Sequence, residues 1–284
     1  MRKMVIFIGM LLAGITCDAQ QEYTQVKNLY YAQGETQEKR LNSQDDLSFL
    51  LEPLNELKLD KNYILSDFRP FYRHLSREWS GLRLYVRNKK TARPDSAYFQ
   101  KEYARYRKNQ KNGTPYEPTK GSVAYLSPFN KIRLTGTQMS IWQAYLLDYS
   151  SLMFGMRNEA NYDKTYLITS AEDVDSIISL LSTWEPIVQG NPIDTTQADS
   201  RRKAHLTDVA NVLSSLKQIK SRNLEPQFES HADSVTITHY AFREFYGLVQ
   251  CKATILLDRG HHHVKDIKHE RPEVMAKYRH QVWY

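Results

Sequence analysis

The amino-acid sequence predicts an α+β fold, in which several amphipathic helices pack against a small, mostly antiparallel sheet. Two observations carry this prediction. Large apolar side chains recur at helical spacing over residues 142–156 and again over 174–184. Two later segments, 235–241 and 248–257, are instead rich in the β-branched and aromatic residues that strands favour. The chain therefore mixes helices with strands rather than repeating a single unit.

Two helices are expected in the first half of the chain. Ser43 is a candidate N-cap for a helix with leucines at helical spacing over 47–57, which Pro53 should kink or split. Pro94 begins a second helix that runs to about Gln110, because the missing N–H of proline is harmless in a first turn.

Three more helices are expected in the second half. The helix over 142–156 should bury its apolar stripe and turn Gln143 and Asp148 to the other side. Ser170 caps the next helix, with Asp173 at the third position of a capping box. The last helix follows a polar loop over 190–199, and its apolar face is formed by Leu206, Val209, Leu213 and Leu216.

Strands are expected where apolar and polar residues alternate. Over 82–87, leucine and valine alternate with arginine and tyrosine, which predicts a half-buried strand whose arginines face outward. Gly247 marks a turn or bulge between the two long strands near the end of the chain. Shorter strands are expected at 122–126, 131–134 and 165–169.

Composition and chain breaks bound the domain organisation. Hydrophobic residues make up 41% of the chain and charged residues 25%, which are values of globular proteins with a packed core. Glycine is scarce, which disfavours folds built on glycine-rich phosphate loops. The most suitable position for a domain boundary is 111–121, where glycine and prolines break the chain. We therefore expect an N-terminal helical and basic region over 20–115 and a C-terminal α+β domain over 116–284.

Residues 1–19 have the order of a cleavable secretory signal peptide. Arg2 and Lys3 precede an uncharged run over 4–16, and Ala19 ends a small-residue cleavage site. The uncharged run is too short for a bilayer, which needs about 20 apolar residues as a helix. We expect cleavage after Ala19, export to the periplasm or the outer membrane, and no transmembrane span in the mature chain.

Lipidation is the alternative fate of this segment. Cys17 lies just behind the apolar run, where a lipoprotein cysteine would carry its lipid anchor. Residues 14–17, Gly-Ile-Thr-Cys, are a poor match to the lipobox Leu-Ala-Gly-Cys at two positions, so plain cleavage is favoured. Cleavage leaves Cys251 as the single cysteine, which cannot form an internal disulfide and is expected to be a small buried residue.

The sequence holds none of the common catalytic signatures. It lacks the Gly-x-Ser-x-Gly elbow, the Walker loop, the Rossmann glycine triplet and His-Glu-x-x-His, and we expect no cofactor. Ser-x-x-Lys occurs at 200–203 and 214–217, without the partner motifs of penicillin-recognising enzymes. Glycosidase chemistry needs only two carboxylates across a sugar. A hydrolase acting on glycan or peptidoglycan is therefore the alternative to a non-enzymatic protein.

The strongest local charge bias lies over 82–120, where eleven lysines and arginines accompany three acidic residues. Cations contact phosphates and aromatic rings stack on bases or sugars, so a polyanion, either nucleic acid or glycan, is a candidate partner. The alternative is a solvated helix face. The candidate polyanion-binding residues are Lys101, Tyr103, Arg105, Tyr106, Arg107, Lys108 and Lys111.

Histidines form the most conspicuous cluster of one residue type. Three follow one another over 261–263, and His269 comes shortly after. Neutral imidazoles bind zinc, nickel or copper, so His261, His263 and His269 are the candidate metal ligands. Three consecutive residues cannot all point to one ion, however, and a solvated loop after a strand is the favoured interpretation.

The sequence also resembles a family. The signal ending in Ala19-Gln20 is similar to those of exported Bacteroidetes proteins, and the segment from Asp175 to Gly260 resembles a domain of unknown function from Bacteroides. Such proteins are associated with conjugative-transposon transfer operons. The resemblance assigns no site residue. It implies an envelope protein that is an accessory of a transfer apparatus. The signal, the missing catalytic signatures and the basic aromatic segment lead us to expect an exported, non-enzymatic protein that makes protein–protein or polyanion contacts.

Overall fold

A computed structural model describes most of the chain in ten stretches, and the account that follows is confined to them. The described residues are 22–32, 46–68, 83–91, 101, 104, 108, 128–154, 165–183, 195–244 and 246–278.

The described helices comprise an N-terminal helix over 22–32 and the elements α4 (Gln138–Phe154), α5 (Ala171–Thr183) and α6 (Thr195–Lys220), with short 3-10 helices η1 (Ser48–Leu51) and η3 (Pro128–Lys131). The strands are β1 (Leu57–Leu59), β2 (Tyr63–Phe68), β3 (Arg83–Asn88), β4 (Ile132–Leu134), β5 (Thr165–Ile168), β6 (Gln227–Ser230), β7 (Ser234–Arg243), β8 (Gly247–Leu257), β9 (Val264–His269) and β10 (Glu273–Ala276).

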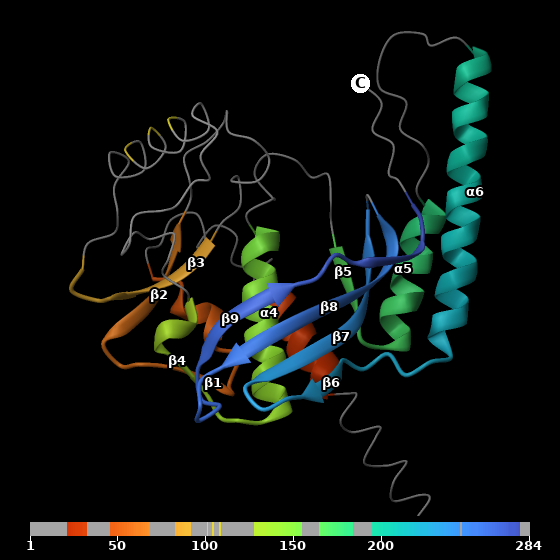
Figure 1. The fold of residues 1–284 in the computed structure, drawn as a ribbon. Coiled ribbons are helices and arrows are strands. Elements are labelled where there is room, and N and C mark those ends of the chain that lie inside the picture. The colour runs from red at the N-terminus through yellow and green to blue at the C-terminus, as the bar shows by residue number, and fades with distance from the viewer. Residues whose placement is uncertain are drawn as a thin grey trace, which may run out of the picture.

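The largest sheet is built on the long β7–β8 hairpin (Figure 1). Strands β9 and β10 pair with β8 along different parts of its length, and β5 and β6 do the same with β7. All of these pairs are antiparallel, so the six strands form one antiparallel sheet. The expected α+β class and the antiparallel pairing are confirmed.

Two small sheets lie beside the large one. Strand β1 pairs with β4, and β2 pairs with β3, both antiparallel. Strands β1 and β4 lie on opposite sides of the expected division at residue 115, and side chains from both enter one apolar cluster.

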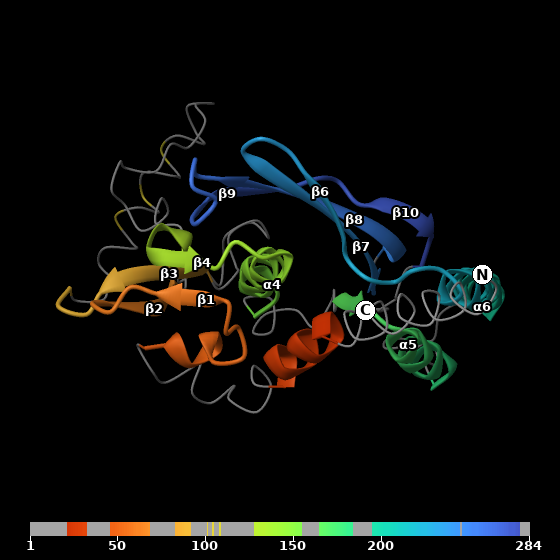
Figure 2. The ribbon, with the colours of Figure 1, turned by 90° about the horizontal axis from the view of Figure 1, so that it is seen from below.

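The two faces of the β7–β8 hairpin contact different groups of helices. Because side chains alternate along a strand, Ile237 and Val249 point to one face, where they pack with Trp142 of α4. Phe242 and Leu248 point to the other face and join the cluster under α5 and α6. Figure 2 shows α4 and the N-terminal helix beside the middle of the sheet, with α5 and α6 together at the end where β10 lies.

Helix α4 is buried more completely than its sequence predicts. Residues 140–147 are all buried, including Gln143 on the expected polar side. The Gln143 amide donates to Asn55 Oδ1 at 3.0 Å and accepts from the backbone N–H of Glu56 at 2.8 Å. A buried amide is stable when both of its ends are hydrogen-bonded. The polar side expected for α4 is therefore buried at Gln143.

Helix α6 also differs from its expected limits. It begins at Thr195, inside the segment expected to be a loop, and Leu206 is 56% exposed instead of buried. The buried face is formed by Val212, Leu216 and Ile219. The core position that the apolar pattern assigns to Leu206 is instead filled by the polar neighbour His205, which is buried.

The leucines over 47–57 are mostly buried without forming a regular α-helix. Only the 3-10 helix η1 forms, and β1 begins at Leu57. Pro53 lies two residues after the end of η1 and lacks the N–H that a continuing α-helix would need there. On β3, Tyr85 is buried, although it shares the arginine side of the alternation. The expected N-cap Ser43, the strand at 122–126 and the surroundings of Trp184 lie outside the described residues.

Candidate functional site

The helix expected after Pro94 is described at three positions, which share one face. Residues 101, 104 and 108 are helical and exposed, and their spacing of three and four places them on the same side. Lys101 and Lys108 therefore face solvent. The other candidate polyanion-binding residues, Tyr103, Arg105, Tyr106, Arg107 and Lys111, lie outside the described residues.

The three candidate metal ligands do not meet. His261 and His263 lie in the β8–β9 turn, whereas His269 is the last residue of β9. His261 Nε2 donates to the carbonyl of Ala232 at 2.9 Å, and His263 Nδ1 donates to Asp258 Oδ2 at 3.1 Å. Over the described ranges, no group of three His, Cys, Asp or Glu side chains could hold a metal ion.

Asp258 organises the β8–β9 turn. Its Oδ1 accepts from the backbone N–H groups of His262 at 2.8 Å and His263 at 3.1 Å. Desolvation would raise the pKa of Asp258, but these hydrogen bonds and that of the His263 ring outweigh it and hold the pKa at about 2. His261 adopts a positive φ of 57° in this turn. The histidine run is thus part of a structured turn.

A buried tyrosine–histidine pair joins α4 to the large sheet. The Tyr145 hydroxyl lies 2.6 Å from Nε2 of His239 on β7, and His239 Nδ1 lies 3.1 Å from the carbonyl of Tyr240. The carbonyl can only accept, so Nδ1 carries the hydrogen and Nε2 accepts from the Tyr145 hydroxyl. Burial lowers the pKa of His239 to about 4 and raises the pKa of Tyr145 well above its ordinary value. Both side chains are therefore neutral near pH 7.

Aromatic rings enclose this pair. Tyr145 stacks between Trp142 and Tyr149, with ring centroids 5.5 and 5.4 Å away. Cys251 of β8 is buried nearby, and burial raises the pKa of its thiol to about 11. The expectation that Cys251 is a small buried residue is confirmed. A thiol with a raised pKa is a weak nucleophile near neutral pH.

A second histidine lies at the edge of the same cluster. His269 Nε2 donates to Asp148 Oδ2 at 2.7 Å, which joins the end of β9 to α4. The two side chains are 31% and 24% exposed, and the His269 ring lies 5.8 Å from Tyr145 between centroids. A carboxylate that orients a partly exposed imidazole is the arrangement that general-base catalysis uses.

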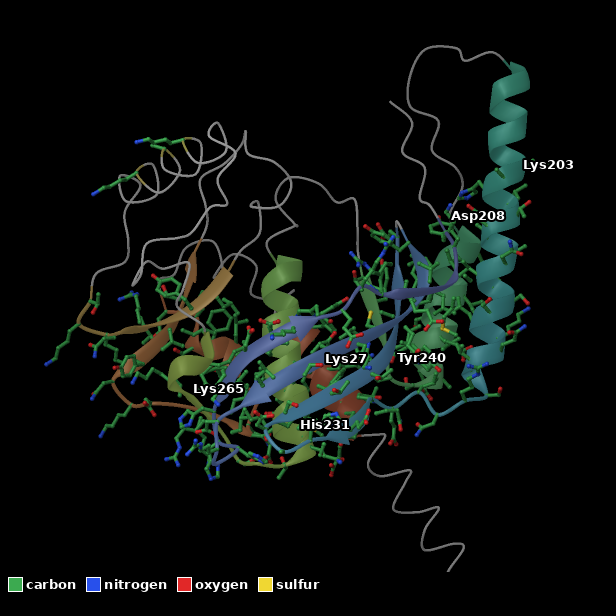
Figure 3. The ribbon with its side chains drawn as sticks, viewed as in Figure 1. Lys27, Lys203, Asp208, His231, Tyr240 and Lys265 are labelled. Atoms are coloured by element: carbon green, nitrogen blue, oxygen red, sulfur yellow. The ribbon has the colours of Figure 1, made fainter. Side chains whose placement is uncertain are left out.

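A buried ion pair fixes the N-terminal helix. Lys27, labelled in Figure 3, places Nζ 2.5 Å from Asp173 Oδ1 and 3.2 Å from the carbonyl of Leu167. Asp173 also forms the expected capping box, since Ser170 Oγ accepts from its N–H at 3.3 Å and its Oδ2 accepts from Ser170 N at 3.0 Å. Burial lowers the pKa of Lys27, and Asp173 offsets part of this effect.

Sequence reasoning missed most of these partners. It identified the capping box because the two residues are three positions apart. It named His269, but as a metal ligand instead of a partner of Asp148. Tyr145 and His239 are 94 positions apart, and Lys27 and Asp173 are 146 positions apart. The one available signal was the single lysine among apolar neighbours of the N-terminal segment.

None of the helices among the described residues has both the length and the apolar character that crossing a membrane requires. Comparisons with known proteins returned no match for this chain among protein-family models, curated proteins or solved structures.

Proposed function

We propose that this chain is an exported, non-enzymatic envelope protein that makes polyanion or protein–protein contacts. Export is supported by the signal-like order of residues 1–19, with Arg2 and Lys3 before an uncharged run. The proposed location is the periplasm or the outer membrane, with a lipid anchor at Cys17 as the alternative. The resemblance of 175–260 to the Bacteroides domain adds a role as an accessory of a conjugative transfer apparatus.

The polyanion contact is supported above all by the shared face of Lys101 and Lys108. Both side chains are exposed on one side of a helix, and the eight residues over 101–108 include four cations and two tyrosines. Cations presented together attract phosphates or sulfates, and salt weakens that attraction. A non-enzymatic role is supported by the described ionisable pairs Tyr145–His239, Lys27–Asp173 and His263–Asp258, each of which serves to hold the fold together.

Retention on immobilised heparin and on immobilised duplex DNA tests this contact. The variant Lys101→Gln/Arg105→Gln/Lys108→Gln should elute at lower salt than the wild-type protein on at least one of the two columns. The mass of the protein purified from its native cells tests export. Cleavage of the signal after Ala19 predicts a chain that begins at Gln20. Unchanged elution of the variant would contradict the proposed contact, and a native chain beginning at Met1 would contradict export.

An envelope hydrolase acting on glycan or peptidoglycan is the second candidate function. It is favoured by the partly exposed Asp148–His269 pair. If this pair acts as a base, purified protein should release soluble fragments from peptidoglycan or an envelope polysaccharide, and Asp148→Asn should abolish the release while the protein stays folded. Equal release by wild type and variant, or none by either, would remove this candidate.

A further inference from the structure

Six exposed cations gather at the end of the molecule opposite α5 and α6. We call them the basic surface: Lys58, Lys61, Lys89, Lys90, Arg133 and Arg259. They come from four segments that are far apart in sequence and that do not include the helix of Lys101 and Lys108. Figure 3 shows many nitrogen-tipped side chains at this end, near the labelled Lys265.

Backbone contacts bring these segments together. Lys58 of β1 lies directly opposite Arg133 of β4 in the register of that sheet. The N–H of Lys89 donates to the carbonyl of Asn62 at 2.9 Å, which places the end of β3 beside the β1–β2 turn. The N–H of Leu134 donates to the carbonyl of His262 at 2.8 Å, so the β8–β9 turn with Arg259 lies beside Arg133.

The direct pairing of Lys58 with Arg133 is unfavourable by itself. Side chains opposite one another on an antiparallel pair have Cβ atoms about 5 Å apart, and like charges there destabilise the sheet. Both side chains are exposed, while their neighbours Leu57 and Ile132 are buried. An anion bound between the two cations would convert this repulsion into attraction.

The acidic groups nearby leave the excess of positive charge in place. Asp258 turns its carboxylate into its own turn, where His262 and His263 donate to it. Asp60, between Lys58 and Lys61 in the sequence, is half-buried, and the Glu56 carboxylate accepts from the hydroxyls of Thr135 and Thr137. Asp233, whose carbonyl accepts from the N–H of Leu257, is the exposed acid beside the β8–β9 turn, so six cations still exceed four acids. Among the described residues, the side chain of none of the six cations forms an ion pair or a hydrogen bond.

The lack of exposed large apolar side chains on the basic surface limits which polyanions it can bind. The exposed large apolar side chains of the described residues are Leu29, Leu206, Tyr246 and Val274, and none of them lies in the four segments. Binding of single-stranded nucleic acid relies on exposed aromatic rings, and interfacial membrane binding relies on exposed apolar side chains. The cations lie on two strands and three turns, so we expect them to contact phosphates of both strands of a duplex.

We infer that the basic surface binds the phosphate backbone of duplex nucleic acid without reading its sequence. The inference shares the polyanion class of the proposed function, but it places the contact on a separate surface. Six phosphate contacts would make the affinity steeply dependent on salt and nearly independent of base sequence.

Fluorescence anisotropy with a labelled 20-base-pair duplex at 100 mM salt tests this surface. The variant Lys58→Gln/Arg133→Gln/Arg259→Gln should bind at least about tenfold more weakly than wild type, because three phosphate contacts are lost. The matched control Lys217→Gln/Lys268→Gln/Lys277→Gln removes the same charge at exposed positions elsewhere and should stay within about twofold. Circular dichroism of each variant checks that the fold is kept.

The outcomes separate this inference from the proposed function. Loss of binding in the basic-surface variant alone supports the inference. Loss only in Lys101→Gln/Arg105→Gln/Lys108→Gln keeps the proposed function and overturns the inference. Equal loss in the matched control would show a net-charge effect and overturn it too. Stronger binding to single-stranded DNA, heparin or anionic phosphatidylglycerol vesicles than to the duplex would assign the surface to another partner and likewise overturn it.

Discussion

The fold keeps His239 neutral by burying its side chain. It is buried, donates from Nδ1 to a carbonyl and accepts at Nε2 from Tyr145. In the unfolded chain a histidine binds its proton near pH 6.5, whereas burial lowers the pKa of His239 to about 4 in the fold. Between these two values the unfolded state holds more protons, so stability must fall as the pH falls.

The variant His239→Gln tests this constraint. Between pH 7 and pH 4, the proton linkage of His239 should lower the free energy of unfolding by about 3 kcal/mol. Glutamine can still pair with Tyr145 but does not titrate, so this part of the pH dependence should disappear. Urea unfolding at pH 7, 6, 5 and 4 measures it, with the exposed His231→Gln as the control. A wild-type slope retained in His239→Gln would contradict the assignment.

Removing Asp173 and removing Lys27 should lower the stability of the fold by different amounts. Asp173→Ala removes the cap of α5 and leaves a buried ammonium group unpaired, which should cost about 3–5 kcal/mol. Lys27→Met should cost less, because Asp173 keeps its hydrogen bonds to the backbone of residues 169 and 170. The double variant should lose less free energy of unfolding than the two single variants lose together. Strict additivity in a double-mutant cycle would show that the two groups do not interact.

At the residue scale, the sequence indicates local relations and misses distant ones. The capping box of Ser170 and Asp173 follows from spacing alone. Nothing in the sequence pairs His239 with Tyr145, because strand register and helix rotation together bring them into contact. Gln143 shows the same limit, since its burial depends on Asn55 and Glu56 from a distant segment.

Among the elements, the β7–β8 hairpin depends most on one glycine. Gly247 has a φ of +90°, and a Cβ atom at this position would lie 2.1 Å from the Ala276 carbonyl oxygen of β10. Gly136 has a nearly identical φ of +91° with no atom within 4 Å of its hypothetical Cβ. The two glycines therefore share the conformational requirement and differ in the steric one.

This difference predicts unequal costs for the same substitution. Gly136→Ala should cost about 1 kcal/mol through backbone strain alone. Gly247→Ala should cost several kcal/mol, because β10 must also move away from the hairpin. Thermal unfolding of the two variants measures the difference. Equal midpoints would show that the approach of β10 to Gly247 does not constrain the fold.

Elements with strong periodicity were predicted well, and short polar ones were not. Helices α4 and α5 and strands β7 and β8 lie close to their expected positions. Strand β9 was missed because four of its six side chains are exposed and charged or polar, which leaves no apolar alternation, and β10 was missed because it has only four residues. Their pairing comes from the hydrogen bonds that β8 offers at its outer edge.

At the scale of the whole molecule, the fold gathers charge that the sequence disperses. The net charge of +7 and the bias over 82–120 are visible in the sequence. The basic surface is not, because its cations come from four short segments that the β1–β4 and β2–β3 pairings and two turn contacts bring together. The same pairing joins the two regions expected on either side of residue 115 into one apolar cluster.

The central claim is that these gathered cations bind duplex phosphate groups through charge. The most direct measurement is the dissociation constant of the wild-type protein for a duplex between 50 and 200 mM salt. Six phosphate contacts predict a slope of about −5 for the logarithm of the association constant against the logarithm of salt concentration. A slope flatter than about −1, or no binding at the lowest salt, would contradict the account.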